Sequence, residues 1–233
     1  MHTVKLALLG LTAAATIALS VIALNPPMRA ESTSTYVKPT TTATPAAAPP
    51  PSAVFIGDSY TAGAGSSDPA QLFPTIVGKA QGWAVTNLGR GGTGYLAASG
   101  PLGCGLDYCP NYREMIEAAK DANPSIIIVS GGRNDLNMTG LYDQVSGFYA
   151  DLRASFPDAT IRATAPLWDD DEPAPELEEL GAQVKSAVES VGGEYLEIGQ
   201  PIVGNPDLVS ADGIHPNDAG YAAIATAVIE QYI

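Results

Sequence analysis

From Ala53 to the end of the chain, short apolar runs alternate with longer stretches whose hydrophobic positions repeat at helical spacing. The apolar runs predict five strands, at residues 53–57, 83–89, 125–132, 159–168 and 194–199. The other stretches predict five helices, at residues 68–79, 111–122, 141–156, 175–191 and 216–233. Pro74 is an irregularity in the first helix. The run at 125–132 is continuous and β-branched, as expected of a strand that is buried on both faces.

The regular alternation of strands and helices predicts the fold class. In α/β proteins a helix connects one strand to the next parallel strand, so helices cover both faces of the sheet. We therefore predict an α/β fold with a five-stranded parallel sheet. Sites in such open sheets lie beyond the carboxyl ends of the strands, where all but one of the polar motifs of this chain are found.

The chain before the first strand has a different character. Residues 6–24 form an uncharged apolar run after Lys5, which is typical of a signal peptide or a membrane anchor. Residues 31–52 are rich in Thr, Pro and Ala and predict an extended linker. We therefore expect a signal peptide or anchor at 1–30, this linker, and one domain at 53–233. Whether secreted or tethered through the apolar run, the domain is expected outside the cytoplasm.

The chain is strongly acidic, with 25 Asp and Glu residues, 11 Lys and Arg residues and a formal net charge of −14. A negative field repels phosphate, so nucleic acid is not an expected partner. The acidity is more typical of a protein that must stay soluble outside the cell. The acidic run at 169–172 is expected to form a solvated loop, because its spacing matches no cation site.

The few cysteines and histidines limit the metal and redox chemistry of the chain. Cys104 and Cys109 do not have the spacing of a zinc knuckle, and in an oxidising compartment they are expected to close a small disulfide loop. His215 is the only histidine besides His2, which excludes a histidine-rich metal site. We expect no metal and no cofactor, and we expect a monomer.

The first polar motif is FIGDSYTAGAG at residues 55–65, which includes the end of the first strand. Its serine, Ser59, is expected on a tight strand-to-helix turn, where a hydroxyl can project at the carboxyl edge of the sheet. Ser59 is a candidate nucleophile if a base removes its proton, and a helix cap is the alternative. Residue 61 is Thr, so the G-x-S-x-G turn of α/β-hydrolases is absent.

The second motif is ADGIHPNDAG at residues 211–220, before the closing helix. His215 is the sole candidate for an imidazole base in the domain. Asp212 precedes it by three residues in a glycine-containing turn, close enough to bind Nδ1–H and leave Nε2 free to face a serine. Taken alone, the motif also fits a surface turn in which the histidine caps a helix.

Two further motifs follow strands. In SGGRND at 130–135, Asn134 is a candidate donor to an oxyanion, whereas Asp135 is expected to brace its loop. In TNLGRGGTGY at 86–95, the N–H of Gly92 is a second candidate donor, and a plain flexible loop is the alternative. This segment also satisfies G-x-G-x-x-G, but it follows the second strand and lacks an acidic partner for a ribose, so we do not expect a nucleotide site.

Together these motifs resemble the SGNH (GDSL-type) hydrolase family over nearly all of residues 53–233. The resemblance is carried by Gly57-Asp58-Ser59, Asn87 with Gly92, Gly132-x-Asn134-Asp135 and Asp212-x-x-His215. It assigns the four namesake residues of the family to Ser59, Gly92, Asn134 and His215. It also implies a three-layer α/β/α flavodoxin-like fold. Tyr60 replaces the leucine of the GDSL name, and Gly91 is an alternative to Gly92 as the donor.

The resemblance implies hydrolysis of esters, thioesters or carbohydrate acyl groups. We expect a carboxylic ester hydrolase of the esterase or lipase type, working through an acyl-serine intermediate. Its catalytic residues would be Ser59, Asp212 and His215, and its oxyanion hole would comprise Ser59, Gly92 and Asn134. The substrate would be a small ester or an acylated glycan. The alternatives are an acyltransferase or deacetylase acting on cell-envelope glycans, and an inactive surface-binding domain.

Overall fold

The computed structural model describes residues 48–232 of the chain. The expected signal peptide or anchor at 1–30, and the linker as far as residue 47, lie outside the described residues, so the predicted boundaries stay predictions. None of the helices within residues 48–232 is both long enough and apolar enough to cross a membrane.

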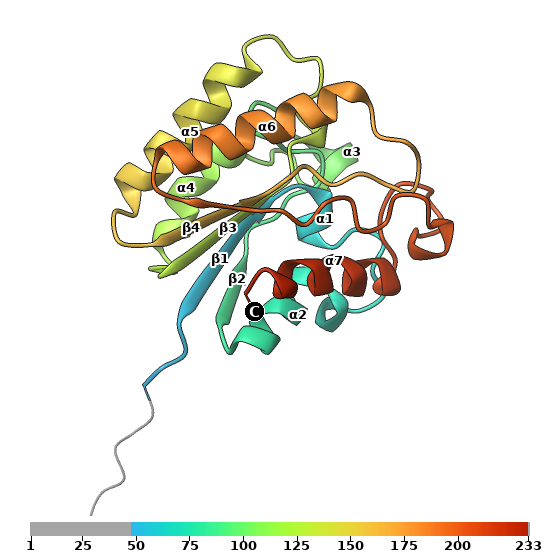
Figure 1. Ribbon diagram of the computed structural model, residues 1–233, viewed down its shortest axis with the longest axis horizontal. Coiled ribbons are helices and arrows are strands. Elements are labelled where there is room, and N and C mark those ends of the chain that lie inside the picture. Colours follow the sequence, from blue (N-terminus) through green and yellow to red (C-terminus); the bar gives the residue numbers. More distant parts are fainter. Residues whose placement is uncertain (1–47, 233) are drawn as a thin grey trace, which may run out of the picture. The chain divides into compact units, whose positions relative to one another are not determined.

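A five-stranded parallel sheet, in the order β2-β1-β3-β4-β5, forms the centre of the described domain (Figure 1). Its strands are β1 Ser52–Gly57, β2 Ala84–Asn87, β3 Ile126–Ser130, β4 Thr160–Thr164 and β5 Glu194–Leu196. The prediction of five parallel strands is confirmed. The prediction that one strand extends to residue 168 is wrong, because β4 ends at Thr164 and Pro166 has no N–H to continue the ladder.

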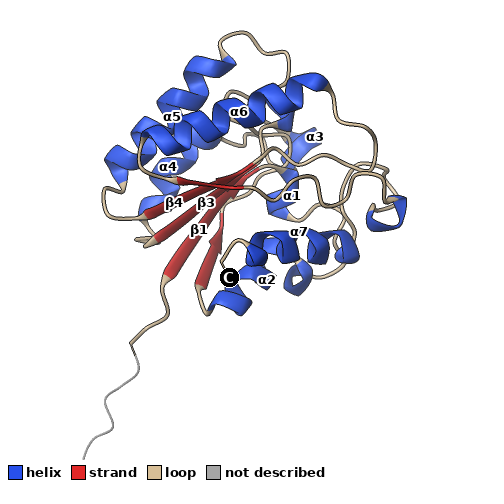
Figure 2. Cartoon of the chain, in the orientation of Figure 1, coloured by secondary structure: helices blue, strands red, loops and turns tan. Residues whose placement is uncertain are grey.

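Longer helices cover both faces of the sheet, which confirms the three-layer α/β/α arrangement (Figure 2). One face carries α4 Tyr112–Lys120, α5 Leu141–Ser155 and α6 Pro175–Ser190. The other face carries α2 Phe73–Gln81 and α7 Asp218–Glu230. Pro74 lies in the first turn of α2, where a missing N–H costs no intrahelical hydrogen bond, so it does not interrupt the helix.

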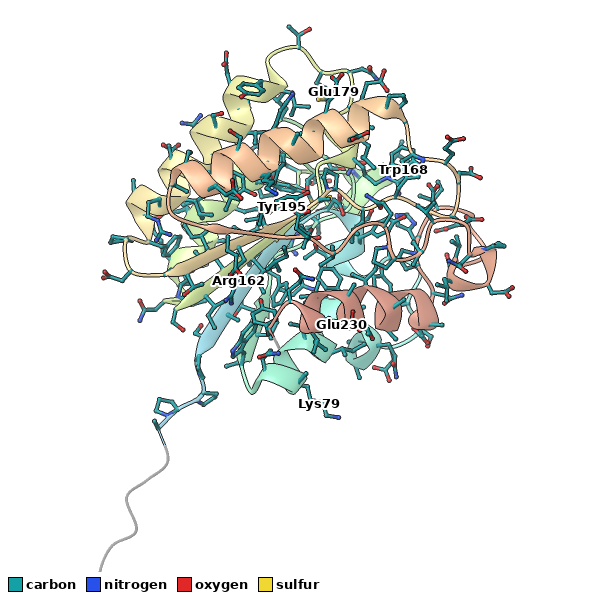
Figure 3. All side chains as sticks on the ribbon, viewed as in Figure 1. Lys79, Arg162, Trp168, Glu179, Tyr195 and Glu230 are labelled. Atoms are coloured by element: carbon teal, nitrogen blue, oxygen red, sulfur yellow. A yellow bond between two sulfur atoms is a disulfide. The ribbon has the colours of Figure 1, made fainter. Side chains whose placement is uncertain are left out.

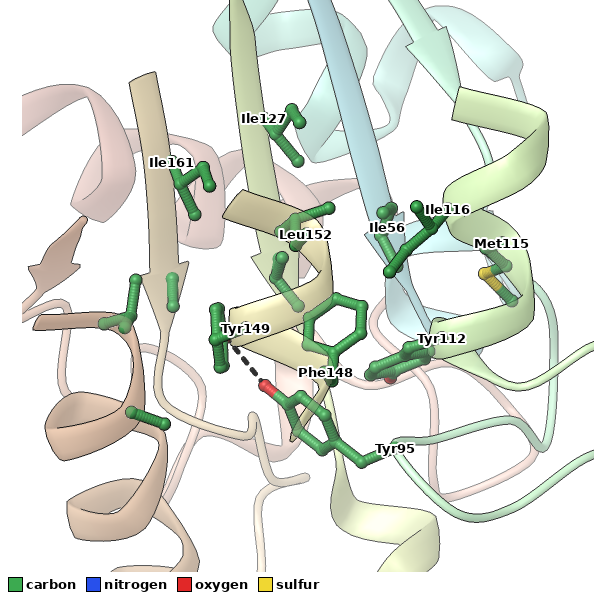
Figure 4. Packing of buried hydrophobic residues seen from close by; sticks show 14 of the residues in the cluster. Ile56, Tyr95, Tyr112, Met115, Ile116, Ile127, Phe148, Tyr149, Leu152 and Ile161 are labelled. Carbon is green, nitrogen blue, oxygen red and sulfur yellow. Dashed lines mark hydrogen bonds between the residues drawn. The ribbon is translucent and has the colours of Figure 1, made fainter. Parts of the chain in front are cut away.

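Each face of the sheet packs against its own hydrophobic cluster, because successive residues of a strand point to opposite faces. In β3, Ile127 and Val129 belong to the cluster beneath α4, α5 and α6, and Ile128 belongs to the cluster beneath α2 and α7. All three are fully buried, so the prediction of a strand buried on both faces is confirmed. Phe148 and Tyr149 of α5 pack within the first cluster (Figure 4).

Several short helical turns were not predicted, because segments this short show no periodicity. They are α1 Ser59–Ala62, α3 Pro101–Cys104 and the 3₁₀ turns Arg133–Asp135 and Pro206–Leu208. A further 3₁₀ turn, Pro69–Gln71, lies within the helix predicted at 68–79, which the structure divides into this turn and α2. The helix α1 and the turn at 133–135 follow the carboxyl ends of the paired strands β1 and β3. They therefore lie at the edge of the sheet where α/β proteins place their sites.

The expected disulfide joins Cys104 and Cys109. Cys104 ends α3, and the backbone of Cys109 pairs with Ser99 in an antiparallel bridge. The bond therefore closes part of the long loop between β2 and α4. Structural disulfides are typical of proteins that fold outside the cytoplasm, which agrees with the expected export.

Candidate active site

Ser59 is the first residue of α1, directly beyond the carboxyl end of β1. Asp58 caps this helix by accepting a hydrogen bond from the N–H of Tyr60 at 3.0 Å. The turn depends on a glycine at position 57, because a Cβ atom there would lie 2.1 Å from Thr61 Oγ1 and 2.2 Å from the carbonyl oxygen of Ser130. The structure therefore gives the capping role to Asp58 and leaves the Ser59 hydroxyl for other chemistry.

Asp212 and His215 form a hydrogen-bonded pair in the loop before α7, with Asp212 Oδ2 and His215 Nδ1 2.7 Å apart. A carboxylate only accepts hydrogen bonds, so Nδ1 carries the proton and Nε2 has a free lone pair. Partial burial acts to raise the pKa of Asp212, but backbone and side-chain hydrogen bonds from His215 hold this pKa well below its usual range. Asp212 therefore stays ionised and holds the imidazole in the tautomer that a general base requires.

The loop that carries His215 lies against the turn that carries Ser59. The hydroxyl of Tyr60 donates to the carbonyl oxygen of Ile214 at 2.6 Å, and the centres of the Tyr60 and His215 rings are 5.9 Å apart. A Cβ atom at Gly65, just beyond α1, would lie 3.0 Å from His215 Cβ. Two segments that are far apart in the sequence therefore meet at one end of the sheet.

Gly92 and Asn134 follow β2 and β3, the two strands that flank β1. Asn134 Nδ2 donates to the carbonyl oxygen of Thr93 at 2.9 Å. The amide has a second N–H, which makes no other hydrogen bond within residues 48–232 and can donate to a ligand. Gly92 has a φ of +73°, a conformation that favours glycine. The N–H of Arg90 donates to the carbonyl oxygen of Gly57 at 3.0 Å, which joins this loop to the turn of Ser59.

Asp135 braces the loop after β2, as expected from its place in SGGRND. Its carboxylate is buried and accepts hydrogen bonds from the N–H groups of Tyr95, Leu96 and Ala97, at 2.7 to 3.0 Å. Burial raises the pKa of Asp135, and the three hydrogen bonds oppose that rise. The loops after β2 and β3 are thus bound to each other, which places Gly92 and Asn134 in one structural unit.

A buried ion pair beside Tyr60 was not predicted. Arg133 Nη2 and Asp169 Oδ2 are 2.8 Å apart, and the two side chains are only 12% and 10% exposed. The prediction that residues 169–172 form a solvated loop is therefore wrong at Asp169. The guanidinium of Arg133 also lies 4.2 Å from the centre of the Trp168 ring. Trp168 belongs to the loop after β4 (Figure 3). The sequence held one signal for this ion pair: the cation Arg133 stands within SGGRND, directly after the most hydrophobic strand.

Asp58, beside the nucleophile candidate, is a third buried carboxylate after Asp135 and Asp169, and its burial was not predicted. It is 1% exposed, and burial raises its pKa to about 6 against the hydrogen bond from Tyr60 and the charge of Arg133. Between about pH 4 and about pH 6 the folded protein therefore binds a proton that the unfolded chain releases. This protonation stabilises the fold at low pH, and the contribution is lost as the pH rises through about 6.

Asp58→Asn should remove this pH dependence, because the amide retains a capping oxygen and does not titrate. Between about pH 4 and about pH 7, the wild type should lose about 2–3 kcal/mol of unfolding free energy through Asp58, and the variant should not. The stability of the variant relative to the wild type therefore rises by this amount. Urea denaturation at both pH values measures the difference. If the two proteins showed parallel stability curves, the raised pKa of Asp58 would be wrong.

Two other features bear on what the domain can bind. Within residues 48–232, no three His, Cys, Asp or Glu side chains come together as a metal site would require. A cavity of about 510 Å³ lies between α6 and the ends of β4 and β5, and neither Ser59 nor His215 lines it.

The groups gathered at the sheet edge are a hydroxyl, an oriented imidazole and two candidate N–H donors, which are the parts of acyl-transfer chemistry.

Residues 55–223 match the family model of the GDSL-like lipase/acylhydrolase family. Among curated proteins, the chain is similar to the GDSL lipase Rv0518 of Mycobacterium tuberculosis, at 30% identity over 148 residues. That match covers 57% of this chain and 62% of the relative, so the chain spans less than two thirds of the relative's length.

Among solved structures, the fold is similar to that of two family 2 carbohydrate esterases. One, from Corynascus thermopiles (Myceliophthora fergusii) and solved with a carbohydrate-binding domain, has a TM-score of 0.61 at 19% identity, over 80% of this chain and 67% of that chain. The other, from Cellvibrio japonicus, has a TM-score of 0.61 at 17% identity, over 81% of this chain and 62% of that chain. At these identities the likeness shows the shared fold alone. The family match, however, covers most of the chain, from the end of β1 into α7, and the chain therefore belongs to the GDSL-like lipase/acylhydrolase family.

Proposed function

We propose that the protein is an exported serine esterase that cleaves carboxylic esters through a covalent acyl-serine. The observation that supports it most is the Asp212–His215 pair, which lies in a loop packed against the turn of Ser59. A serine hydroxyl is a weak nucleophile until a base removes its proton, and His215 is the sole imidazole within residues 48–232. An inactive binding domain would have no use for this arrangement.

In the proposed reaction, His215 Nε2 takes the proton of Ser59 Oγ while that oxygen attacks the ester carbonyl carbon. The carbonyl oxygen becomes an oxyanion in a tetrahedral intermediate. As the intermediate collapses, the bond to the leaving oxygen breaks, and the imidazolium gives its proton to that oxygen so that an alcohol departs. Water then attacks the acyl-serine with His215 again as base, which releases the carboxylic acid and restores the serine.

Three N–H donors at the ends of β1, β2 and β3 would stabilise the oxyanion. They are the backbone N–H groups of Ser59 and Gly92 and the side-chain amide of Asn134. We favour Gly92 over Gly91, because Gly92 is half-buried whereas Gly91 is buried, with its backbone close to that of Gly103.

Asn134→Ala should lower kcat by about 10²- to 10³-fold and leave KM almost unchanged, because the oxyanion forms only after binding. Steady-state kinetics on a short p-nitrophenyl ester measures both constants. Asn205→Ala removes an exposed amide that hydrogen-bonds only to the carbonyl oxygen of Val203 within residues 48–232, and it should keep the wild-type kcat. A large rise in KM at constant kcat would instead assign Asn134 to substrate binding.

Hydrolysis of p-nitrophenyl esters of graded chain length, together with acetylated sugars, tests the proposed function. Turnover of at least one ester, with a transient acyl group on Ser59 detected by mass spectrometry, would support it. Folded protein that turns over none of these compounds would contradict it and favour the surface-binding alternative.

A second candidate function is the removal or transfer of acyl groups on cell-envelope glycans by the same catalytic residues. The observation that favours it is the fold similarity to two carbohydrate esterases, each at a TM-score of 0.61. Product analysis in the presence of sugar acceptors separates the possibilities. A transferase forms a new acyl-sugar, whereas an esterase releases only the free acid.

Export is part of the proposal and has its own support. The disulfide between Cys104 and Cys109 requires an oxidising compartment, and the apolar run at 6–24 has the character of a signal peptide or tether. The net charge of −14 would repel nucleic acid. The proposed substrate is a small ester or an acylated glycan, and export places it outside the cytoplasm.

A further inference from the structure

Tyr60, which follows Ser59, is 1% exposed, and its hydroxyl makes two hydrogen bonds. It donates to the carbonyl oxygen of Ile214 at 2.6 Å and accepts from Arg133 Nη1 at 2.7 Å. Because Ile214 directly precedes His215, one phenol oxygen joins the loop of the base to a cation from the loop after β3. Both partners are more than 70 residues from Tyr60 in the sequence.

Arg133 is itself held from several sides. Its Nη2 pairs with Asp169 at 2.8 Å, and its guanidinium carbon lies 4.2 Å from the ring centre of Trp168 and 5.2 Å from that of Tyr60. A planar guanidinium suits such a site, because it stacks on rings while its N–H groups bind within its plane. Arg133 is therefore a fixed anchor, and it directly precedes Asn134 in the chain.

The phenol remains a hydrogen-bond donor at any pH at which the enzyme would work. Burial raises the pKa of Tyr60 well above its usual value, and the charge of Arg133 opposes this rise only in part. The carbonyl group of Ile214 thus keeps its O–H partner when the imidazole of His215 gains or loses a proton.

The carboxylate of Asp212 does not supply an anchor of this kind. Within residues 48–232, the hydrogen bonds that reach the carboxylate of Asp212 come from Ser210, Ile214 and His215, which belong to the same loop. The side chain of Asp212 is 47% exposed. The carboxylate therefore orients the imidazole within its loop and does not by itself fix that loop relative to Ser59.

We infer that Tyr60 and Arg133 are positioning residues that clamp the loop of Asp212 and His215 onto the nucleophile turn. The kinetic consequence rests on the proposed function, whereas the clamp is a property of the folded loop. Tyr60 supplies the bond to the loop, and Arg133 fixes the phenol through its ion pair with Asp169. Without the clamp, the imidazole would spend less time facing the serine hydroxyl. Loss of this alignment slows the reaction but does not weaken substrate binding.

Tyr60→Phe tests the clamp, because it removes the hydroxyl and keeps the ring that packs against Arg133. The matched control is Tyr149→Phe: Tyr149 is fully buried in the cluster beneath α4, α5 and α6, and its hydroxyl is hydrogen-bonded to that of Tyr95 at 2.9 Å. We expect kcat to fall about tenfold in Tyr60→Phe with KM within about twofold of the wild type. The Tyr149→Phe control should lose a similar amount of stability and keep the wild-type kcat.

A second measurement does not depend on activity. The chain has two histidines, so in full-length protein carrying His2→Gln the Nδ1–H signal of His215 can be assigned without ambiguity by nitrogen-15 NMR. We expect this proton to exchange with water several-fold faster in Tyr60→Phe than in the wild type. Exchange in Tyr149→Phe should match the wild type.

Arg133→Lys tests the other half of the clamp. Lysine keeps a positive charge beside Asp169, but it lacks the planar fork that binds Tyr60 and Asp169 together. We expect kcat to fall about tenfold, and the double variant Tyr60→Phe/Arg133→Lys to be no slower than the slower single variant, because both changes break one link. Fully additive losses would overturn the clamp.

The exchange measurement separates failure of the clamp from failure of the proposed function. Faster exchange of the His215 proton in Tyr60→Phe alone supports the clamp, even if the wild type hydrolysed none of the esters. Equal exchange rates in Tyr60→Phe and Tyr149→Phe would overturn it. A loss of kcat in Tyr60→Phe without faster exchange would also overturn it, because Tyr60 would then act on catalysis by another route.

Discussion

Replacing Ser59 by alanine is expected to abolish ester turnover, with a fall in kcat of about 10⁵-fold or more. The substitution removes the covalent route, and only the acceleration due to binding and the oxyanion donors remains. Stability should hardly change, because Asp58 rather than Ser59 caps α1 and alanine favours a helix at that position. Kinetics on p-nitrophenyl acetate and thermal denaturation measure the two effects.

Covalent labelling gives an independent readout of the same variant. A serine-directed fluorophosphonate should modify the wild type at Ser59 and leave Ser59→Ala unmodified. Ser125→Ala is the control, because its exposed hydroxyl lies just before β3, at the opposite edge of the sheet. This control should keep both activity and labelling. Ordinary turnover by Ser59→Ala would rule out Ser59 as the nucleophile.

Asp212→Asn is expected to have the second-largest effect, a fall in kcat of about 10³- to 10⁴-fold. Asparagine can still accept from the N–H groups of Ile214 and His215, but its own NH₂ group would face His215 Nδ1 and cannot accept a proton. The imidazole then favours the tautomer with its proton on Nε2, which cannot act as a base toward Ser59. Steady-state kinetics on the same ester measures the loss.

Asp207→Asn is the matched control for this variant. Asp207 is exposed in the 3₁₀ turn Pro206–Leu208, in the same long loop, and its replacement changes the charge by the same amount. It should keep the wild-type kcat. If Asp212→Asn were as active as this control, the carboxylate would not be what orients His215, and the backbone of the loop would suffice.

The fold could be predicted because a parallel sheet covered on both faces leaves a strong hydrophobic signal. The strand β3 shows this most clearly, with three consecutive residues, Ile127 to Val129, buried against alternate faces. The end of β4 could not be predicted in the same way. Residues 165–168 are as apolar as a strand, but they leave the sheet to build the loop that presents Trp168 and Asp169 to Arg133.

The candidate catalytic residues could be named in advance because their motifs are local. The bond between Asp212 and His215 joins residues only three apart, so the spacing alone makes it possible. The turn of Ser59 likewise depends on a few neighbouring residues, with a glycine where the backbone of β3 approaches closely. Roles for these residues in catalysis remain predictions, to be tested by the variants above.

The sequence by itself thus determined the α/β fold, the disulfide partners and the local motifs that hold Ser59, Asp212 and His215. Only the tertiary structure decided that Tyr60, Arg133 and Asp169 are buried together and that the pKa of Asp58 is raised. The physical reason is that periodicity and spacing report interactions between neighbours along the chain. Burial of a charge, and the partner that compensates it, depend on loops from separate strands that meet only in the folded domain.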